Sequence, residues 1–419
     1  MKTAQIVLNG SSVSSSLATL TAIQPHLVFV FADPSWCVGE DRLSPLLQAL
    51  TPAQLVGCST AGEVAGHGVQ ENSCVLTAVH FDDPAFTVTR THVDDMRDSR
   101  AAGERLAVAL APHSPHSVLV FGPGVRLNGS SLVAGMAAGL PGATTLAGGL
   151  AGDAGHFRTT WTIGPDGIRE RDVVAVGFHS PRLKVCHGSF GGWTPFGPVR
   201  RVTRAHENIL YELDGERALD VYRRYLGDYA KDLPASGLLF PFAMLNGDRD
   251  ETGIIRTILG IDAEAGSLLL AGEIDPHGYL RLMHASTDRL VDGAAEAAAR
   301  IGKAPQRSDG LALLVSCVGR KLVMGDRVAE EVAMLDVLLQ GRKLTLGFGR
   351  GAGRVEFEHA RVREIAPRPI PRGMPRRIAA TAAASKSTTI TTATTATTTA
   401  ATSVCKHAAP PATNGGLAI

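Results

Sequence analysis

A cluster of residues that could do chemistry stands near the start of the chain, in the segment "LVGCSTAGEVAG" (55–66). An apolar run that predicts a buried strand leads directly into Cys58, Ser59 and Thr60, and Glu63 follows an Ala-Gly pair. Cysteine and serine can act as nucleophiles, and a carboxylate can act as a base or hold a cation. Four kinds of site fit these residues: a nucleophile, a metal site, a phosphate site, or a pocket that holds a small ligand.

A hydrolase is the weakest of these interpretations. A serine nucleophile is normally found in a GxSxG turn, with an acid and a histidine elsewhere in the chain. The segment "GCSTAG" has Gly57 and Ser59, but Ala61 stands where the second glycine is expected, and no partner histidine is indicated. A Cys58- or Ser59-dependent hydrolase stays an alternative, and burial of Cys58 as a small apolar residue is the simpler interpretation.

Phosphate and metal binding have no clear motif in this sequence. The glycine-rich segment "GPGVRLNGSS" (122–131) lacks the lysine of a phosphate-binding loop. Asn128, Ser130 or Ser131 is therefore expected to cap a helix, and Arg126 to be an exposed loop residue. The six cysteines show no CxxC spacing, which argues against a zinc site or a disulfide framework and favours reduced thiols.

The corner that carries Glu63 has a second copy, which favours a ligand-binding pocket. "STAGE" (59–63) is repeated as "GLAGD", which begins at Gly149 and ends in Asp153. Ligands of open α/β sheets bind where strands end. Glu63 and Asp153 could hold the ammonium group of an amino acid or a similar metabolite, unless each merely caps the segment that follows it.

Arginines and aromatic residues farther along could complete such a pocket. Arg281, in "YLRLMHA", or Arg256, in "IIRTILG", could pair with the carboxylate of a ligand. The alternative is that strand alternation places both arginines on a solvated face. Trp193 and Phe196, in a glycine-rich crossing, could form an apolar wall of the pocket or pack the junction between two domains.

Both corners lie in a duplicated unit of strand, helix, strand and hairpin, which predicts an α/β (mixed α+β) N-terminal half. Residues 30 and 31 match residues 120 and 121 at a spacing of 90, and the same spacing relates 61–63 to 151–153. We infer that repeats 5–93 and 115–190 pack about a pseudo-twofold axis. The predicted strands are 27–33, 54–60, 74–81 and 86–93 in the first unit and 117–124, 144–153, 172–179 and 182–190 in the second, with helices at 44–50 and 130–140.

A second, mixed-sheet domain is predicted from residue 191 onward. Its helices are expected at 216–230, 289–302 and 327–339, and its strands at 238–245, 254–262, 267–274, 279–285 and 311–319. Residues 367–419 are basic and then rich in threonine and alanine without an amphipathic period. We expect this tail to be disordered.

The overall composition excludes several classes of protein. The 419 residues carry a formal charge of +1, so nothing favours nucleic acid or an anionic membrane as a partner. The N-terminal "NGSSVSSS" is too polar for the core of a signal peptide, and no run of about 18 apolar residues could cross a membrane. We expect a cytoplasmic protein.

Several long segments resemble the FIST family of bacterial signal-transduction proteins, among them "LVGCSTAGEVAGHGV", "LAGGLAGD", "GYLRLMHAS" and "LALLVSCVGRKLVMG". The likeness covers roughly residues 5–348. It implies a FIST N domain at 5–190 and a FIST C domain at 191–360. The resemblance also implies a sensory module, not an enzyme, that binds a small molecule such as an amino acid and acts on a histidine kinase or a cyclic-dinucleotide enzyme.

Some proteins similar to this chain are nitric-oxide sensors that bind haem, which gives an alternative function. An axial haem ligand needs a single histidine, and His187, His80 and His284 are the candidates. The resemblance weakens after Phe348, where "GFGRGAGRVEFEH" departs from the usual end of the family. We therefore expect a divergent or truncated FIST C domain that lacks a final strand and leaves a sheet edge exposed.

Overall fold

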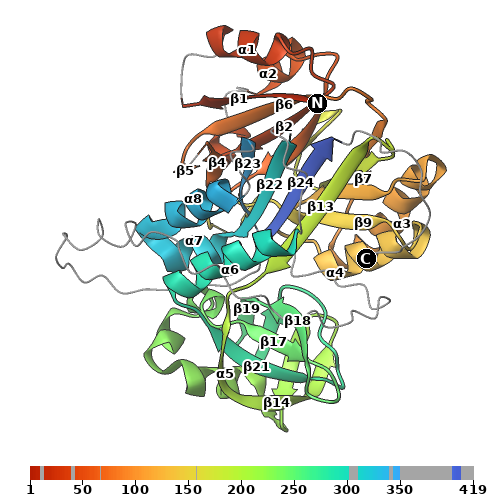
Figure 1. Ribbon diagram of the computed structural model, residues 1–419. Helices are drawn as coiled ribbons and strands as arrows, with labels where there is room; N and C mark the ends of the chain where they lie inside the picture. Colours follow the sequence, from red (N-terminus) through yellow and green to blue (C-terminus); the bar gives the residue numbers. More distant parts are fainter. Residues whose placement is uncertain are drawn as a thin grey trace, which may run out of the picture.

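Four sheets make up a larger and a smaller body in the computed structural model, which describes residues 1–9, 14–38, 43–66, 68–156, 158–301, 310–338, 343–349 and 399–406 (Figure 1). Three of the sheets belong to the larger body, each with its own helices on the outside. The smaller body, drawn in green, lies below them. No helix within the described ranges is long and apolar enough to span a bilayer.

The first sheet has the order β1-β6-β2-β3-β10-β11. Its central strand β2 (Leu27–Ala32) is buried along its whole length, as expected for "LVFVFA". β2 runs parallel to β3 (Gln54–Ser59) and antiparallel to β6 (Cys74–His80). Helices α1 (Ser14–Thr21) and α2 (Ser44–Ala49) lie on the outside. The other strands are β1 (Lys2–Leu8), β10 (Thr162–Gly164) and β11 (Gly167–Arg169).

The second sheet repeats this arrangement in the order β7-β12-β8-β9. β8 (Ser117–Gly122) runs parallel to β9 (Thr145–Leu150) and antiparallel to β12 (Asp172–Phe178). β7 (Phe86–His92) forms the edge next to β12. The helices α3 (Ser99–Leu110) and α4 (Gly129–Gly139) cover this sheet, and α4 is capped by the Asn128 side chain, as the sequence predicts.

The third sheet has the order β13-β24-β22-β23-β4-β5 and draws its strands from distant parts of the chain. β22 runs parallel to β23 and antiparallel to β24, so the pattern of the first two sheets appears a third time. The strands are β4 (Glu63–Ala65), β5 (Gly68–Gln70), β13 (Leu183–Phe190), β22 (Gly310–Cys317), β23 (Lys343–Gly349) and β24 (Thr399–Lys406), and the helices α6 (Thr287–Arg300), α7 (Val318–Met324) and α8 (Val328–Leu338).

The larger body therefore has three related units, and the predicted pseudo-twofold arrangement of two units is wrong. In each unit an edge strand (β1, β7 or β13) precedes an antiparallel strand (β6, β12 or β24) and two parallel strands. The inner faces of all three sheets share one apolar core, in which Phe31 and Phe121 meet edge to face at 5.7 Å near Leu313 and Val315. A third unit is needed to close this core.

Both predicted hairpins are also wrong, although their strands exist. β6 belongs to the first sheet, whereas β7 belongs to the second. In the same way, β12 belongs to the second sheet and β13 to the third. The physical reason is that β6 and β12 pair with the apolar central strands of their own units, whereas β7 and β13 become the edge strands of the next. Each unit is thus tied to its neighbour by an exchanged strand.

The smaller body is built from residues between the crossing at Trp193 and the end of β21, and it has its own apolar core around Tyr222. The chain then returns to the larger body through α6. The strands are β14 (Thr194–His206), β15 (Ile209–Leu213), β16 (Glu216–Arg217), β17 (Phe242–Leu245), β18 (Glu251–Arg256), β19 (Ile258–Asp262), β20 (Ser267–Leu270) and β21 (Tyr279–His284), with helix α5 (Ala218–Leu226).

Part of the tail that was predicted to be disordered forms strand β24. Residues 399–406 pair with β13 along eight residues and with β22 along six. β-Branched threonine and valine suit a strand, and the position between β13 and β22 leaves two rows of backbone groups that need partners. β24 therefore covers the edge of β22 that faces β13. The remainder of 367–419 lies outside the described residues.

Candidate functional site

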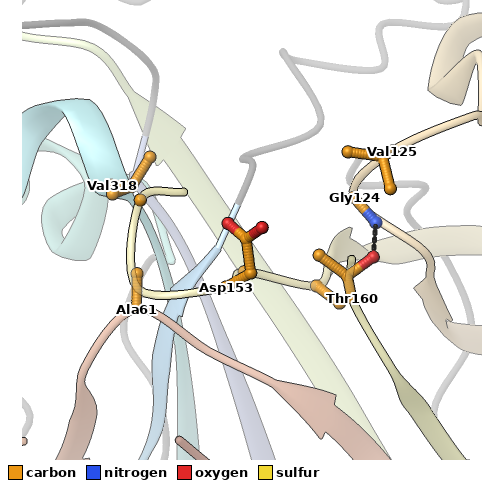
Figure 2. A pocket seen from close by; sticks show the side chains of 9 residues that line it. Ala61, Gly124, Val125, Asp153, Thr160 and Val318 are labelled. Atoms are coloured by element: carbon orange, nitrogen blue, oxygen red, sulfur yellow. Dashed lines mark hydrogen bonds between the residues drawn. The ribbon is translucent and has the colours of Figure 1, made fainter. Parts of the chain in front are cut away.

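A cavity lies where the parallel strands of the three units end. The empty space here, counted together with the adjoining solvent at its mouth, is about 230 Å³. Its walls are the segments that follow β3, β8, β9 and β22, as the carboxyl-end rule for α/β sheets predicts. Figure 2 shows the labelled lining residues around the carboxylate of Asp153. The lining consists of Ala61, Gly124, Val125, Ala151, Gly152, Asp153, Gly155, Thr160 and Val318.

The two predicted corners are bonded directly to each other beside this cavity. The Ser59 hydroxyl donates to the Gly152 carbonyl at 2.6 Å, and the Gly152 amide donates to the Ser59 carbonyl at 2.8 Å. The Ala154 amide donates to the Thr60 carbonyl at 3.3 Å. The prediction that both corners border one crevice is therefore confirmed.

Asp153 is the charged side chain of the cavity wall. It is 5% exposed, and its Oδ2 accepts hydrogen bonds from the backbone amides of Arg158 at 2.6 Å and Thr159 at 3.2 Å. These bonds fix the loop between β9 and β10 around the carboxylate. A buried carboxylate on the wall of a small cavity is a strong site for an ammonium or another hydrogen-bond donor.

Glu63 is placed differently from Asp153 and does not line the cavity. It is fully buried in β4, where it accepts from the hydroxyl of Thr60 and from the hydroxyl of Ser73 at 2.7 Å. The Ser73 amide adds a bond at 3.2 Å. Burial raises the pKa of Glu63 to about 7, and the bonds from Thr60 and Ser73 offset part of that rise. Its partners make Glu63 part of the support beneath the corner.

A shift of one residue between the repeats explains why the two acids differ. Val30 pairs with Gly57, whereas Val120 pairs with Gly148, so β2 and β8 are 90 residues apart but β3 and β9 are 91 apart. The corners are also 91 residues apart. The Thr60 amide donates to the last carbonyl of β2, and the Ala151 amide donates to the last carbonyl of β8, so these two residues are equivalent. Asp153 therefore corresponds to Gly62, and the predicted equivalence of Asp153 with Glu63 is wrong.

The residues that could act as nucleophiles are held inside the protein. Cys58 and Ser59 are buried, and burial raises the pKa of the Cys58 thiol well above its usual value. The Ser59 hydroxyl donates to the Gly152 carbonyl of the second corner and accepts from the Trp161 amide at 3.0 Å. Thr60 is likewise buried and bonded to Glu63. The Ser59 side chain bonds to the second corner, Thr60 bonds to Glu63 within the first, and none of the three residues lines the cavity.

Four other predicted pocket residues lie away from the cavity lining. Gly149 is inside β9, and Trp193 is buried among the side chains of the central core at the junction of the two bodies. Arg281 is in the smaller body, where Nε donates to the Gly197 carbonyl at 3.3 Å. Arg256 is 5% exposed and donates to the Glu273 carbonyl and the Ser130 hydroxyl, so it joins the two bodies.

The three haem-ligand candidates are far apart in the fold. His80 ends β6 and lies against His26, with ring centroids 4.5 Å apart. His187 is exposed on β13, and His284 is exposed on β21 beside Phe196. None of them lines the cavity. Across the ranges that the structure describes, no three His, Cys, Asp or Glu side chains gather into a group that could hold a metal ion.

The sequence did not predict Thr160 and Val318, which line the cavity, or Lys321, which bonds to the lining residue Ala61. Thr160 accepts from the Gly124 amide at 2.8 Å, which joins two walls of the cavity (Figure 2). Val318 closes a third wall at the start of α7. Lys321, one turn later, donates to the Ala61 carbonyl at 2.8 Å and pairs with Glu71. A search for a third strand-corner-helix repeat at "LALLVSCVGRKL" (311–322) is the signal that could have found Val318 and Lys321.

Comparisons with known proteins agree with the architecture. The FIST N domain matches residues 26–216, and the FIST C domain matches residues 218–349. An uncharacterized protein of Mycobacterium bovis is 26% identical over 333 residues, covering 74% of this chain and 81% of its own length. An uncharacterized protein of Mycobacterium tuberculosis is 25% identical over 327 residues, with the same coverage.

A cyanuric acid hydrolase from A. caulinodans is 13% identical, with a TM-score of 0.27 over 72% of this chain and 92% of the hydrolase. So low a score carries no argument about function. The two domain matches together span most of the chain and indicate a sensory signalling module. The chain belongs to the FIST family, with a FIST N domain followed by a FIST C domain.

Proposed function

We propose that the cavity beside Asp153 binds the small ligand of this sensory module, and that the ligand is an amino acid or a similar metabolite with an ammonium group. The observation that carries the proposal is the buried carboxylate of Asp153 on the cavity wall.

The ammonium and carboxylate groups of an amino acid both have candidate partners around this cavity. We expect the ammonium to pair with Asp153, and Val125 and Val318 form apolar parts of the cavity wall. Lys321 places a cation at the Ala61 corner, with a side chain that is 20% exposed, and can attract the carboxylate. We assign this role to Lys321 because its Nζ lies at the Ala61 corner, whereas Arg281 and Arg256 lie away from the cavity lining.

A signal can leave the cavity through helix α7. Two residues after Val318, Arg320 is fully buried, pairs with Glu331 at 2.6 Å and donates to the carbonyls of Gly191 and Leu290. Gly191 belongs to the crossing into the smaller body. A ligand that favours one position of α7 can thereby shift the population of two arrangements of the bodies. The receiving partner would be a histidine kinase or a cyclic-dinucleotide enzyme in the cytoplasm, in line with the family resemblance.

A ligand screen tests the proposal directly. The purified chain is heated with each of the twenty amino acids in turn, and the melting temperature is recorded, followed by calorimetric titration of any compound that raises it. We expect one amino acid or a close relative to stabilise the protein, because binding to the folded state raises its stability by mass action. A haem absorption band in protein from haem-supplemented cells, with no response to any amino acid, would contradict the proposal.

A further inference from the structure

Strand β9 differs from its two counterparts in the other units at its outer edge. β3 is followed in its sheet by β10, and β23 is followed by β4. β9 ends its sheet, and among the described residues no strand pairs with its outer side. Two of the three units therefore carry a hairpin at a position that is open in the second unit.

The backbone of β9 presents hydrogen-bonding groups at this edge. The amides of Thr145 and Ala151 donate toward β8, to the carbonyls of His116 and Gly122. In a parallel pair, alternate residues face the partner, so Leu146, Gly148 and Leu150 direct their amides outward. On β3 the equivalent outward amide, that of Ser59, donates to the Trp161 carbonyl at 2.8 Å. The edge of β9 has the same geometry as an edge that is paired.

Burial gives independent evidence that β9 lacks a neighbour. Every residue of β3 except Gln54 is buried, whereas all six residues of β9 are only half-buried. The β9 sequence "TLAGGL" is as apolar as that of β3 and carries no charge that would discourage pairing. An apolar strand with a half-exposed edge is a template for another strand.

The order of the units indicates which segment of the chain belongs there. The hairpin that follows β3, β4–β5, is added to β23 of the third unit. The hairpin that follows β9, β10–β11, is added to β3 of the first unit. The same cyclic rule adds the segment that follows β23 to β9. β23 ends at Gly349, and residues 350–398 separate it from β24.

We infer that the outer edge of β9 is a strand-binding site for the chain segment that follows Gly349. Pairing there completes the cyclic exchange in which each unit lends a segment to another, and it satisfies the outward amides of Leu146, Gly148 and Leu150. The inference rests on sheet topology and burial and does not depend on the ligand of the cavity.

Hydrogen exchange of the full chain, measured at single amides by mass spectrometry, tests this inference. In one variant residues 350–360 are replaced by a Gly/Ser sequence of equal length, which keeps β24 in place. In the matched control, residues 370–380 are replaced in the same way. The Ser59 amide, which pairs with β10, reports on whether each variant is folded.

We expect the Leu146, Gly148 and Leu150 amides to be protected in the native chain and in the control, and to exchange about tenfold faster or more in the 350–360 variant. The Ser59 amide should stay protected in all three proteins. Fast exchange of the β9 amides in the native chain would overturn the inference. Protection that survives the 350–360 replacement would also overturn it, because another segment, a second copy or a partner would then cover the edge.

Discussion

The corners after β3 and β9 have the same Ala-Gly-acid sequence, yet their carboxylates serve opposite purposes. After β3 the chain turns at once into β4, and Glu63 is carried into the interior, where Thr60 and Ser73 bind it. After β9 the chain makes a loop before β10 begins at Thr162, and Asp153 stays on the cavity wall. The one-residue shift between the repeats thus places the same motif differently, so that Glu63 supports the fold and Asp153 lines the cavity.

Glu63→Gln should have the largest effect on stability, and the effect should depend on pH. The folded-state pKa of about 7 lies above the ordinary 4.5, so the stabilising contribution of this group is present below pH 4.5 and is lost as the pH rises through 7. The glutamine variant does not titrate. Its free energy of unfolding, relative to the native chain, should therefore rise by up to about 3 kcal/mol from pH 4.5 to pH 8.

Urea unfolding at several pH values measures this difference. The same substitution at Glu104, which is exposed on α3, controls for the loss of a carboxylate. If the free energy of unfolding changes with pH equally in the native chain and in Glu63→Gln, the pKa of Glu63 is not raised by folding, and the prediction is contradicted.

Ser59→Ala should have the next largest effect, because Ser59 joins the two corners. The substitution leaves the Trp161 amide without its side-chain acceptor and removes the bond to the Gly152 carbonyl. A cost of about 1–3 kcal/mol is expected for such a buried loss. Thermal or urea unfolding measures it, and a variant as stable as the native chain would contradict the link between the corners.

Lys321→Met tests the bond between Lys321 and the first corner, which has no counterpart at the second corner among the described contacts. The methionine keeps the apolar stem but loses the bond to the Ala61 carbonyl and the ion pair with Glu71. Because the Lys321 side chain is partly exposed, we expect a loss of about 1 kcal/mol or less. Equilibrium unfolding in urea gives the value, and a loss above about 3 kcal/mol would mean that Lys321 carries more of the fold than this structure assigns to it.

Asp153→Asn should change stability least. The asparagine side-chain oxygen can still accept from the amides of Arg158 and Thr159, so the loop after β9 keeps its bonds. We expect a change below about 1 kcal/mol in the free energy of unfolding. A large drop in melting temperature would assign Asp153 the structural role that Glu63 has.

Much of the fold was predictable from local patterns, and the errors lie where distant segments meet. The apolar runs of β2, β3, β8 and β9 and the spacing of 90 residues between β2 and β8 correctly predicted two related units. The third unit was missed because the smaller body separates its edge strand β13 from β22 and β23, and because β24 comes from a threonine- and alanine-rich tail. The strand-corner-helix pattern at 311–322 is the local signal of this unit, but β13 and β24 lie far from it in the sequence.

The site was predictable in its location but not in its residues. The two corners do meet at the strand ends, and Asp153 does line the cavity. A one-residue difference in strand spacing moved Glu63 out of the site, and spacing of that kind is visible only when strand partners are known. Val318 and Lys321 belong to the unit that the sequence did not reveal.

The most direct test of the account compares Asp153→Asn with Glu63→Gln in calorimetric titrations with the amino acid that raises the melting temperature of the native chain most. Loss of the charge at Asp153 should weaken binding by about 10- to 100-fold, whereas Glu63→Gln, measured at a pH where it is folded, should stay within about twofold of the native chain. Equal losses in both variants, or a loss confined to Glu63→Gln, would contradict the assignment of the cavity beside Asp153 as the ligand site.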